Sequence, residues 1–373
     1  MTKEWLEYLS LIKEANSFKD RIRSYISDRN ELMGVGGQKN SPPYTQKMIS
    51  VFRYRHIAYE AFMGNVVGRL HKLNIEPPKP VLLPTILLRD ESGELQPTTD
   101  STPIIRRLEK EYPARKLLPE DPALSFINYL LEDFGDEWVT KYMFHYRWHF
   151  EEDADNAGTI LPLVDFAINA PEDLLQEFKK GIAERQIGRL WVVGSNATTA
   201  DLIDTSYRRF VKLMDDHLSK SQFLFGDKPS SADFAIYGQL TQLIGFDPTS
   251  REIAYATSRR LVAWVDVMAD LSGHDVVNSS WTSLEDSPST LKEIMKEFGK
   301  MYVPALLANA NAIMEGDETW ETEIDGSVWK QKAFPYQAKC LKWIKAEFNI
   351  LSENNKTRVK TFLKGTGCEI ILE

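Results

Sequence analysis

The spacing of apolar residues changes once along the chain, between residues 113 and 121. Before that point, short apolar runs that end in glycine or proline alternate with helical patterns. The runs ELMG, HIAYE and PTILLRD and a segment around Leu95 predict strands. The segments SPPYTQKMISVFRYR, EAFMGNVVGRLHKL and TDSTPIIRRLEKEYP predict helices. The predicted order is therefore strand, helix, strand, helix, strand, strand, helix.

Beyond residue 121, apolar residues recur at three- and four-residue spacing, which predicts an all-helical region. The proline-containing segment YPARKLLPEDP separates the two patterns and is the expected domain boundary. We divide the chain into an N-terminal helical extension (1–28), a mixed domain (29–113), a helical domain (121–319) and a C-terminal extension (320–373). The last segment contains a helical pattern and ends in GCEIILE, which is consistent with a terminal strand. The fold class is α+β.

The composition is that of a folded globular protein, with 43% hydrophobic and 27% charged residues. A chain of 373 residues exceeds one ordinary core, so two domains are expected. The formal net charge is -9, and the sequence has no long basic tract. Because basic residues supply the attraction to nucleic acid and to anionic membranes, neither partner is expected.

The N-terminus has no uninterrupted apolar segment of the signal-peptide type, and the sequence has no 18-residue apolar run. The two cysteines, Cys340 and Cys368, form no CxxC pair, which favours a reducing compartment and excludes a cysteine-rich zinc site. We therefore expect a cytoplasmic protein without a membrane span.

Three segments, in order, resemble the glutathione S-transferase (GST) superfamily. SPPYTQKMISVFRYRHIAYE is similar to the Ser/Cys-Pro-aromatic-x-x-basic opening of the first helix. LLPTILLRDESGELQPTTDSTPIIRRLE resembles the cis-proline before the third strand and the acidic-Ser pair that opens the next helix. FLFGDKPSSADFAIYGQL resembles the helical-domain signature, in which Ser230 and Asp233 form a capping box. The resemblance spans about residues 30–270. It implies a thioredoxin-like domain followed by an all-α GST C-terminal-like domain.

The resemblance also implies a site for reduced glutathione. A cis Pro84 would expose the backbone of Leu83 for pairing with the cysteinyl part of the tripeptide. Asp100 and Ser101, at a helix start, suit the γ-glutamyl ammonium and carboxylate groups. The alternatives are a trans-proline in an ordinary loop and a helix cap without a ligand.

The catalytic position departs from the family pattern. The family places a Ser, Tyr or Cys there to stabilise the glutathione thiolate, whereas alignment puts Pro42 at that position. Ser41, shifted by one residue, and Tyr44 are the two candidates, although Ser41 also suits a plain helix cap. No cysteine is present here, so thiol-disulfide exchange is not expected.

One helical segment, KYMFHYRWHF, carries Tyr142, His145, Tyr146 and His149 on one face. In the family, the corresponding helix lines the co-substrate pocket, so these residues and Arg147 are candidates for its wall. The alternative is an aromatic stripe in the core. His145 and His149 lack a third ligand, so no metal is expected.

The leading hypothesis is an enzyme that directs the thiolate of glutathione at a hydrophobic electrophile, by conjugation, dehalogenation, or ether or peroxide cleavage. One alternative is a non-catalytic relative that acts as a binding or regulatory protein. Another is a relative that binds a different small molecule around Arg147. By analogy with the family, we expect a homodimer.

Overall fold

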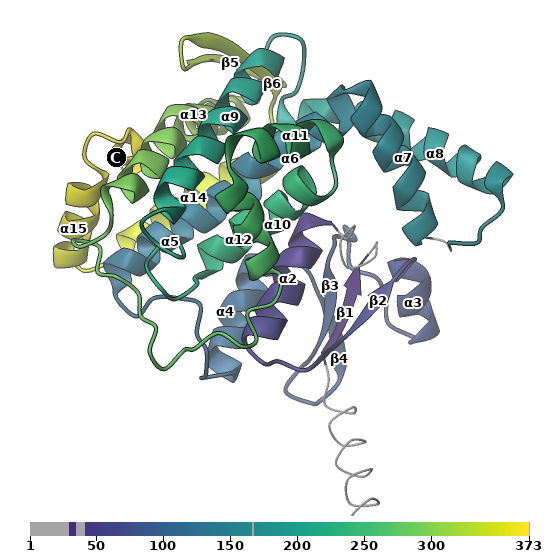
Figure 1. The fold of residues 1–373 in the computed structure, drawn as a ribbon, viewed down its shortest axis with the longest axis horizontal. Helices are drawn as coiled ribbons and strands as arrows, with labels where there is room; N and C mark the ends of the chain where they lie inside the picture. Colours follow the sequence, from purple (N-terminus) through teal and green to yellow (C-terminus); the bar gives the residue numbers. More distant parts are fainter. Residues whose placement is uncertain (1–29, 35–41, 166–167, 373) are drawn as a thin grey trace, which may run out of the picture.

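The computed structural model describes residues 30–34, 42–165 and 168–372. The predicted N-terminal helical extension (1–28) and Ser41 lie outside the described residues. A small sheet with helices packed on it occupies one end of the molecule, and a larger helical body occupies the other (Figure 1). Helices α7 (Glu151–Asp165) and α8 (Glu172–Ile187) project sideways from this body (Figure 1).

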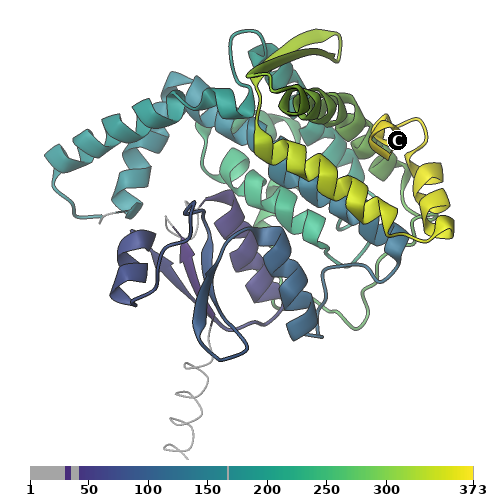
Figure 2. The ribbon, with the colours of Figure 1, turned by 180° about the vertical axis from the view of Figure 1, so that it is seen from behind.

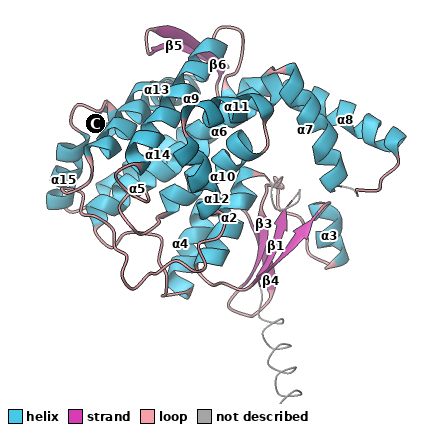
Figure 3. Cartoon of the chain, in the orientation of Figure 1, coloured by secondary structure: helices cyan, strands magenta, loops and turns pink. Residues whose placement is uncertain are grey.

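The sheet, whose strands are magenta in Figure 3, has four strands in the order β2-β1-β3-β4. β1 pairs with β2 in parallel and with β3 antiparallel, and β3 pairs with β4 antiparallel. The elements follow one another in the predicted order, which confirms the thioredoxin-like arrangement. They are β1 (Asn30–Gly34), α2 (Pro43–Tyr54), β2 (Tyr59–Met63), α3 (Val66–Lys72), β3 (Thr85–Arg89), β4 (Leu95–Thr98) and α4 (Ser101–Glu111).

Strand β3 is buried on both faces, because helices cover both sides of the sheet. Ile86 and Leu88 point to one face and join the large core that includes residues of α2 and α4. Leu87 points to the opposite face and forms a small cluster with Val66 and Leu70 of α3. The segment EAFM, predicted as the start of this last helix, instead forms most of β2, which runs parallel to β1.

The second region is helical, as the spacing of its apolar residues predicted. Its long first helix is continuous through a π-helical turn, so α5, η1 and α6 form one run. The elements are α5 (Pro122–Phe134), η1 (Gly135–Val139), α6 (Thr140–His149), α7 (Glu151–Asp165), α8 (Glu172–Ile187), η2 (Leu190–Val193), α9 (Ala200–Leu218), α10 (Ser231–Gly245), α11 (Pro248–Thr257), α12 (Arg259–Met268) and α13 (Ser289–Glu315).

The centre of the helical region is α10, which is buried along nearly its whole length. Its N-terminus has the predicted capping box. The Asp233 carboxylate accepts hydrogen bonds from the backbone N–H and the hydroxyl of Ser230, at 2.9 and 2.7 Å. This carboxylate also accepts a bond from the backbone N–H of Leu224, so it anchors the preceding loop as well. The box therefore has a structural role.

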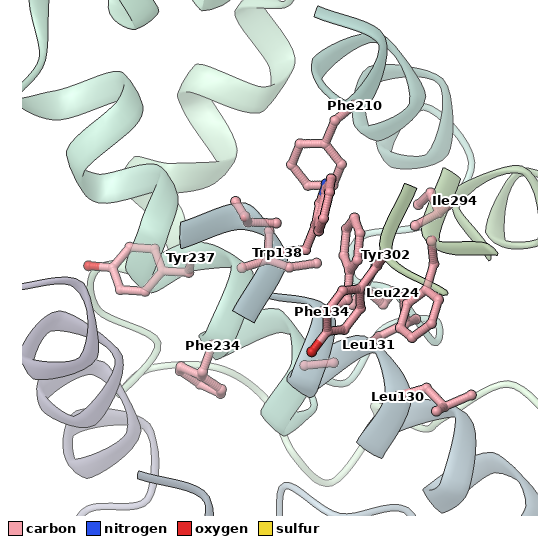
Figure 4. Close-up of a cluster of buried hydrophobic side chains, with 14 of the residues drawn as sticks. Leu130, Leu131, Phe134, Trp138, Phe210, Leu224, Phe234, Tyr237, Ile294 and Tyr302 are labelled. Carbon is pink, nitrogen blue, oxygen red and sulfur yellow. The ribbon is translucent and has the colours of Figure 1, made fainter. Parts of the chain in front are cut away.

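Aromatic side chains fill the core where α5, η1, α9 and α13 meet (Figure 4). The Phe134 ring lies 6.3 Å from the ring of Tyr302, and Trp138 lies 5.7 Å from the same ring. All three side chains are fully buried. Because side chains of this size bury large apolar areas, this cluster is a main source of stability for the helical region.

The C-terminal segment forms a hairpin and two further helices. The elements are β5 (Thr319–Ile324), β6 (Ser327–Lys332), α14 (Pro335–Asn349), α15 (Glu353–Leu363) and η3 (Cys368–Leu372). The hairpin turns at Asp325-Gly326, where both residues have positive φ, as a two-residue turn requires. The C-terminal GCEIILE, which suggested a strand, instead forms the 3-10 helix η3, in which Cys368 and Ile371 are buried. Figure 2 shows α14, in yellow, beside α5.

Candidate functional site

A cavity of about 840 Å³ lies between the sheet domain and the helical region. Its walls come from the segment before β3, the start of α4, the run α5–η1–α6, the end of η2, and the C-terminal segment Phe334–Glu347. Its volume falls in the range of small-molecule sites. The cavity is thus built from parts of the chain that are far apart in sequence.

All four residues predicted to bind the tripeptide line this cavity: Leu83, Pro84, Asp100 and Ser101. The Leu83–Pro84 peptide bond is cis, as the resemblance implied. Leu83 precedes the paired part of β3, whose register with β1 begins at Thr85. The backbone of Leu83 therefore lies next to the sheet without being part of its ladder.

Asp100 caps α4, and its side chain accepts a hydrogen bond from the backbone N–H of Thr102 at 3.3 Å. Its φ of 75° is rare for a residue other than glycine. Such backbone conformations persist mainly where the surrounding structure imposes them, often at functional sites. Ser101 is the first residue of α4, where free N–H groups attract an anion. The cap and the anion site are therefore adjacent.

A buried lysine, to which we assigned no role from the sequence, holds Ser101 in place. The Lys47 Nζ donates to Ser101 Oγ at 3.0 Å, to Glu132 Oε1 at 2.8 Å and to Asp136 Oδ2 at 2.7 Å. Burial opposes its charge, but the two carboxylates outweigh burial and keep the pKa of Lys47 above its usual value. Since Ser101 accepts this bond, its own proton remains available to a ligand.

Lys47 was visible in the sequence as the basic residue of the PYTQK motif, four residues into the helix that begins at Pro43. Helix α2 lies against α10, because Gly238 allows close approach. A Cβ on Gly238 would lie 2.6 Å from the carbonyl oxygen of Pro43. This contact fixes the N-terminus of α2, and with it Tyr44, beside the helical region.

Tyr44 is the one described candidate for thiol activation, and it lines the cavity. Its hydroxyl donates a hydrogen bond to the backbone carbonyl of Asp136 at 2.7 Å. Burial, followed by the nearby charges of Glu137 and Asp136, raises the pKa of Tyr44 well above its usual value. The phenol is therefore neutral and acts as a donor. The Tyr44 hydroxyl must break its hydrogen bond to the Asp136 carbonyl before it can donate one to a thiolate.

The expected co-substrate wall was wrong for the tyrosines Tyr142 and Tyr146, which do not line the cavity. Both are fully buried in the core. The Tyr142 hydroxyl lies 2.6 Å from Ser206 Oγ, and the Tyr146 hydroxyl donates to Asp204 Oδ1 at 2.6 Å. The stripe does lie on one face of α6, but that face packs on α9. The core alternative is therefore correct.

The other three candidates of this stripe also lie away from the cavity. His145 is buried, and its Nδ1 lies 2.8 Å from Ser195 Oγ. Arg147 forms a buried ion pair with Asp247 at 2.8 Å. His149 is exposed and stacks on His145 with ring centroids 4.5 Å apart. The α6 residues that do line the cavity are Thr140, Lys141 and Phe144.

The end of α5 and the π-helical turn that follows it bring three carboxyl groups to the cavity: Asp133 from α5, and Asp136 and Glu137 from the turn. Turns of this kind occur frequently at functional sites. Gly135 lies against α10, where a Cβ would be 3.0 Å from both the Ala235 Cβ and the Ile236 backbone nitrogen. The close packing of Gly135 against α10 therefore accompanies the local widening of the helix that presents these carboxyl groups.

The C-terminal extension supplies another wall of the cavity, which the sequence did not predict. Tyr336 donates a hydrogen bond from its hydroxyl to Asp100 Oδ2 at 3.2 Å. Glu347, at the far end of the same helix, pairs with Arg106 of α4 at 2.7 Å. Helix α14 is thus tied to the N-cap and to the middle of α4.

Two further searches bear on the chemistry of the described residues. None of their His, Cys, Asp and Glu side chains form a group of three or more arranged to hold a metal ion. Among the same residues, no helix combines the length and apolar character needed to cross a membrane.

A comparison with known protein families supports the fold of the helical region. Residues 197–267 match the family model described as glutathione S-transferase, C-terminal domain. The match covers α9 to α12, including the capping box of α10. No curated protein matches the sequence.

Solved structures with a similar arrangement include three bacterial proteins. A glutathione transferase family member from Pseudomonas fluorescens Pf-5, with two glutathione bound, is 15% identical with a TM-score of 0.40, covering 65% of this chain and 87% of its own. FzlA from C. crescentus is 12% identical with a TM-score of 0.40, covering 68% and 93%. The beta-etherase LigF from Sphingobium sp. strain SYK-6 is 16% identical with a TM-score of 0.39, covering 64% and 93%. Matches at these identities and TM-scores assign no activity to this chain.

Proposed function

The chain belongs to the glutathione S-transferase superfamily, and from this premise we propose that it binds reduced glutathione and directs its thiolate at an electrophile in the same cavity. The sulfur would form a bond to the electrophilic atom, and the leaving group would depart with its electron pair. Conjugation by substitution, dehalogenation and ether cleavage fit this scheme. Cleavage of a peroxide fits it when a second glutathione then reduces the oxidised sulfur and forms the disulfide.

One observation carries the proposal: Leu83, Asp100 and Ser101 line a single cavity. These residues offer an amide edge, a carboxylate, and a hydroxyl at a helix N-terminus. An extended γ-linked tripeptide has a matching amide, ammonium and carboxylate. The buried Lys47 donates to Ser101, so the Ser101 hydroxyl keeps its own proton for the carboxylate of the ligand. We infer that the γ-glutamyl group binds at Asp100 and Ser101.

For thiol activation we propose Tyr44 or Ser41. A hydroxyl that donates to the sulfur lowers the pKa of the thiol, because it stabilises the charged form. The Tyr44 phenol is a neutral donor in the cavity, and exchanging its bond to the Asp136 carbonyl for one to sulfur would supply this effect. Replacing Ser41 with Ala and Tyr44 with Phe, one at a time, and measuring thiolate absorbance of bound glutathione distinguishes the two. Unchanged absorbance in both variants would remove the proposed role.

A second candidate function is a non-catalytic protein that binds a small molecule in this cavity. The bond from Tyr44 to the Asp136 carbonyl favours it, since the hydroxyl is already occupied. Under this alternative glutathione binds, but the pKa of its thiol stays at the solution value. The thiolate measurement therefore separates the two functions.

The remaining expectations are also proposals. We propose that the chain divides into a glutathione-binding domain (29–113), a helical domain (121–319) and a C-terminal extension (320–373). The end of α4 at Glu111, the start of α5 at Pro122 and the end of α13 at Glu315 support these limits. We further propose a cytoplasmic homodimer that acts on small-molecule electrophiles.

Glutathione binding is tested by retention on glutathione-agarose and by thermal unfolding with millimolar glutathione. A ligand at a hundredfold excess over its Kd adds about 2.7 kcal/mol to the free energy of unfolding. We expect this stabilisation in the wild-type chain and its loss in Ser101→Ala. The matched control is Ser283→Ala, because Ser283 lies in the loop before α13 and outside the cavity. No stabilisation of the wild-type chain at this excess would refute glutathione binding.

A further inference from the structure

The part of the cavity that adjoins the proposed γ-glutamyl site is rich in carboxyl groups, and Lys47 contacts both Ser101 and Asp136 there. Asp133, Asp136 and Glu137 line it, and Glu132 lies directly behind them. Lys47 is the only ammonium among the described residues that contacts these carboxylates in an ion pair. Four carboxyl groups thus share one paired cation.

The hydrogen bonds of these carboxyl groups leave acceptor positions open. Asp133 Oδ2 accepts from the Tyr302 hydroxyl at 2.8 Å. Asp136 is only 8% exposed, and its Oδ2 bonds to Lys47, but its Oδ1 has no partner among the described residues. Within the same residues, Glu137 makes no hydrogen bond or ion pair that meets ordinary distance limits, although it lines the cavity. A buried acceptor without a partner is costly unless a ligand satisfies it.

A second lysine lies near the cluster without neutralising it. Lys141 is 1% exposed, and its Nζ contacts the Val193 carbonyl and Gln331 Oε1, both at 3.4 Å. The same ammonium lies over the rings of Trp138 and Trp329, at 5.5 and 5.8 Å from their centroids. Lys141 therefore forms no ion pair with the carboxyl groups among the described residues, although its charge opposes the rise in the pKa of Glu137.

The pKa values of these carboxyl groups agree with a site that has fewer positive than negative charges. Burial, followed by repulsion from Asp133 and Asp136, raises the pKa of Glu137 to about 8. Burial also raises the pKa of Asp133 to about 7 and that of Asp136 to about 6. A cation placed beside these carboxyl groups would stabilise their ionised forms and lower their pKa values.

The cavity also has apolar and aromatic walls. Phe144, Val192, Phe334 and Trp343 line it together with the carboxyl groups. Aromatic faces also attract cations, so they favour an organic cation on an apolar body. The described residues offer no group of three ligands arranged for a metal ion.

We infer that this part of the cavity selects a co-substrate that carries a protonated amine on an apolar or aromatic body, with the amine beside Glu137 and Asp133. As an assignment of co-substrate, the inference rests on the proposed function. The amine completes the acceptors that the chain leaves open, and the body packs on the aromatic wall. A neutral or anionic electrophile of the same shape binds more weakly.

The test uses three probes with the same ring system: 1-naphthylmethylamine, 1-naphthylmethanol and 1-naphthoate. Their Kd values are measured by calorimetry with the full chain, with and without saturating glutathione. Saturation matters because glutathione would occupy Asp100, another carboxylate of the cavity that an amine could reach. We expect the amine to bind about tenfold more tightly than the alcohol, a small part of what a partly buried charge pair can supply. The anion should bind least.

Substitutions of the cavity carboxyl groups test whether these groups cause the preference for the amine. Glu137→Gln and Asp133→Asn should each reduce the preference for the amine. Glu323→Gln, the same change on the exposed side of β5, should leave it unchanged. Equal binding of amine and alcohol overturns the inference, as does a preference that survives both cavity variants. Displacement of the amine by Mg²⁺ or Ca²⁺ alone also overturns it, because the site would then be a metal site.

Failure of the inference and failure of the proposed function are distinguishable. Glutathione binding is measured in its own titration, without a probe. If glutathione does not bind but the amine preference depends on Glu137, the proposed function fails and the cation site stands. If glutathione binds and the amine preference is absent, the inference fails alone.

Discussion

The hydroxyl of Tyr336 donates a hydrogen bond to Asp100 Oδ2 at 3.2 Å, across 236 positions of sequence. This bond joins the C-terminal helix α14 to the cap of α4, where the proposed tripeptide site begins. The C-terminal extension is therefore part of the cavity, and its stability is linked to the residues that would hold the ligand.

Tyr336→Phe removes this bond while keeping the ring. A hydrogen bond of this kind contributes about 1 kcal/mol, so local opening of α14 should become about fivefold more frequent. Hydrogen exchange of the amides in residues 335–349 measures the change. Tyr255→Phe is the control, because Tyr255 is exposed on α11 and outside the cavity. Equal exchange in both variants would show that the bond does not hold α14.

Lys47→Met should strongly destabilise the chain. The substitution leaves the carboxyl groups of Glu132 and Asp136 buried without their shared cation, which typically costs about 3–5 kcal/mol. Urea unfolding at neutral pH measures the loss. Lys296→Met on α13 is the control, because its ion pair with Glu293 is exposed and is worth at most about 1 kcal/mol. A loss no larger than that of the control would contradict the network described for Lys47.

Gly238→Ala tests the contact between α2 and α10. The added Cβ would lie 2.6 Å from the Pro43 carbonyl oxygen, so one helix must shift, at a cost of about 1–3 kcal/mol. Gly245→Ala provides a control in the same helix, because its Cβ would meet nothing within 4 Å. It should be neutral or slightly stabilising. Equal stability of the two variants in thermal unfolding would show that α2 does not depend on this close approach.

The raised pKa of Glu137 predicts a pH-dependent contribution to stability. The folded state raises this pKa from 4.5 to about 8, so the folded chain holds the proton more tightly than the unfolded chain. The contribution is complete below about pH 4.5 and is lost as the pH rises through 8. Glu137→Gln removes it, so the variant should gain stability relative to wild type over this interval. A constant difference between the two across urea titrations at pH 5 to 8 would contradict the shift.

Local patterns were sufficient to predict much of the fold and the proposed tripeptide site. The order of strands and helices followed from short apolar runs and their flanking glycines and prolines. Asp100 and Ser101 are adjacent, so one motif was enough to place them at a helix start. The capping box of Ser230 and Asp233 was similarly visible within four residues.

The residues of α6 that line the cavity could not be predicted in the same way. The stripe of Tyr142 and Tyr146 is a correct helical pattern, but spacing alone does not say whether that face meets a cavity or the core. The opposite face, with Lys141 and Phe144, has no distinguishing pattern. A π-helical turn also shifts the register of the helix by one residue, which a regular spacing does not anticipate.

The C-terminal wall was missed for a different reason. Its contact with Asp100 depends on how the chain returns after more than 200 residues, which local sequence does not determine. One local signal was nevertheless available. Asp325-Gly326 between alternating segments is typical of a tight hairpin, and this hairpin precedes α14.

The most direct test of the account is a crystal structure of the full chain with glutathione. The account predicts a γ-glutamyl group bound at Asp100 and Ser101, backbone pairing at Leu83, and the sulfur within hydrogen-bond distance of the Tyr44 or Ser41 hydroxyl. Glutathione bound elsewhere, or a cavity that remains empty at millimolar glutathione, would contradict it.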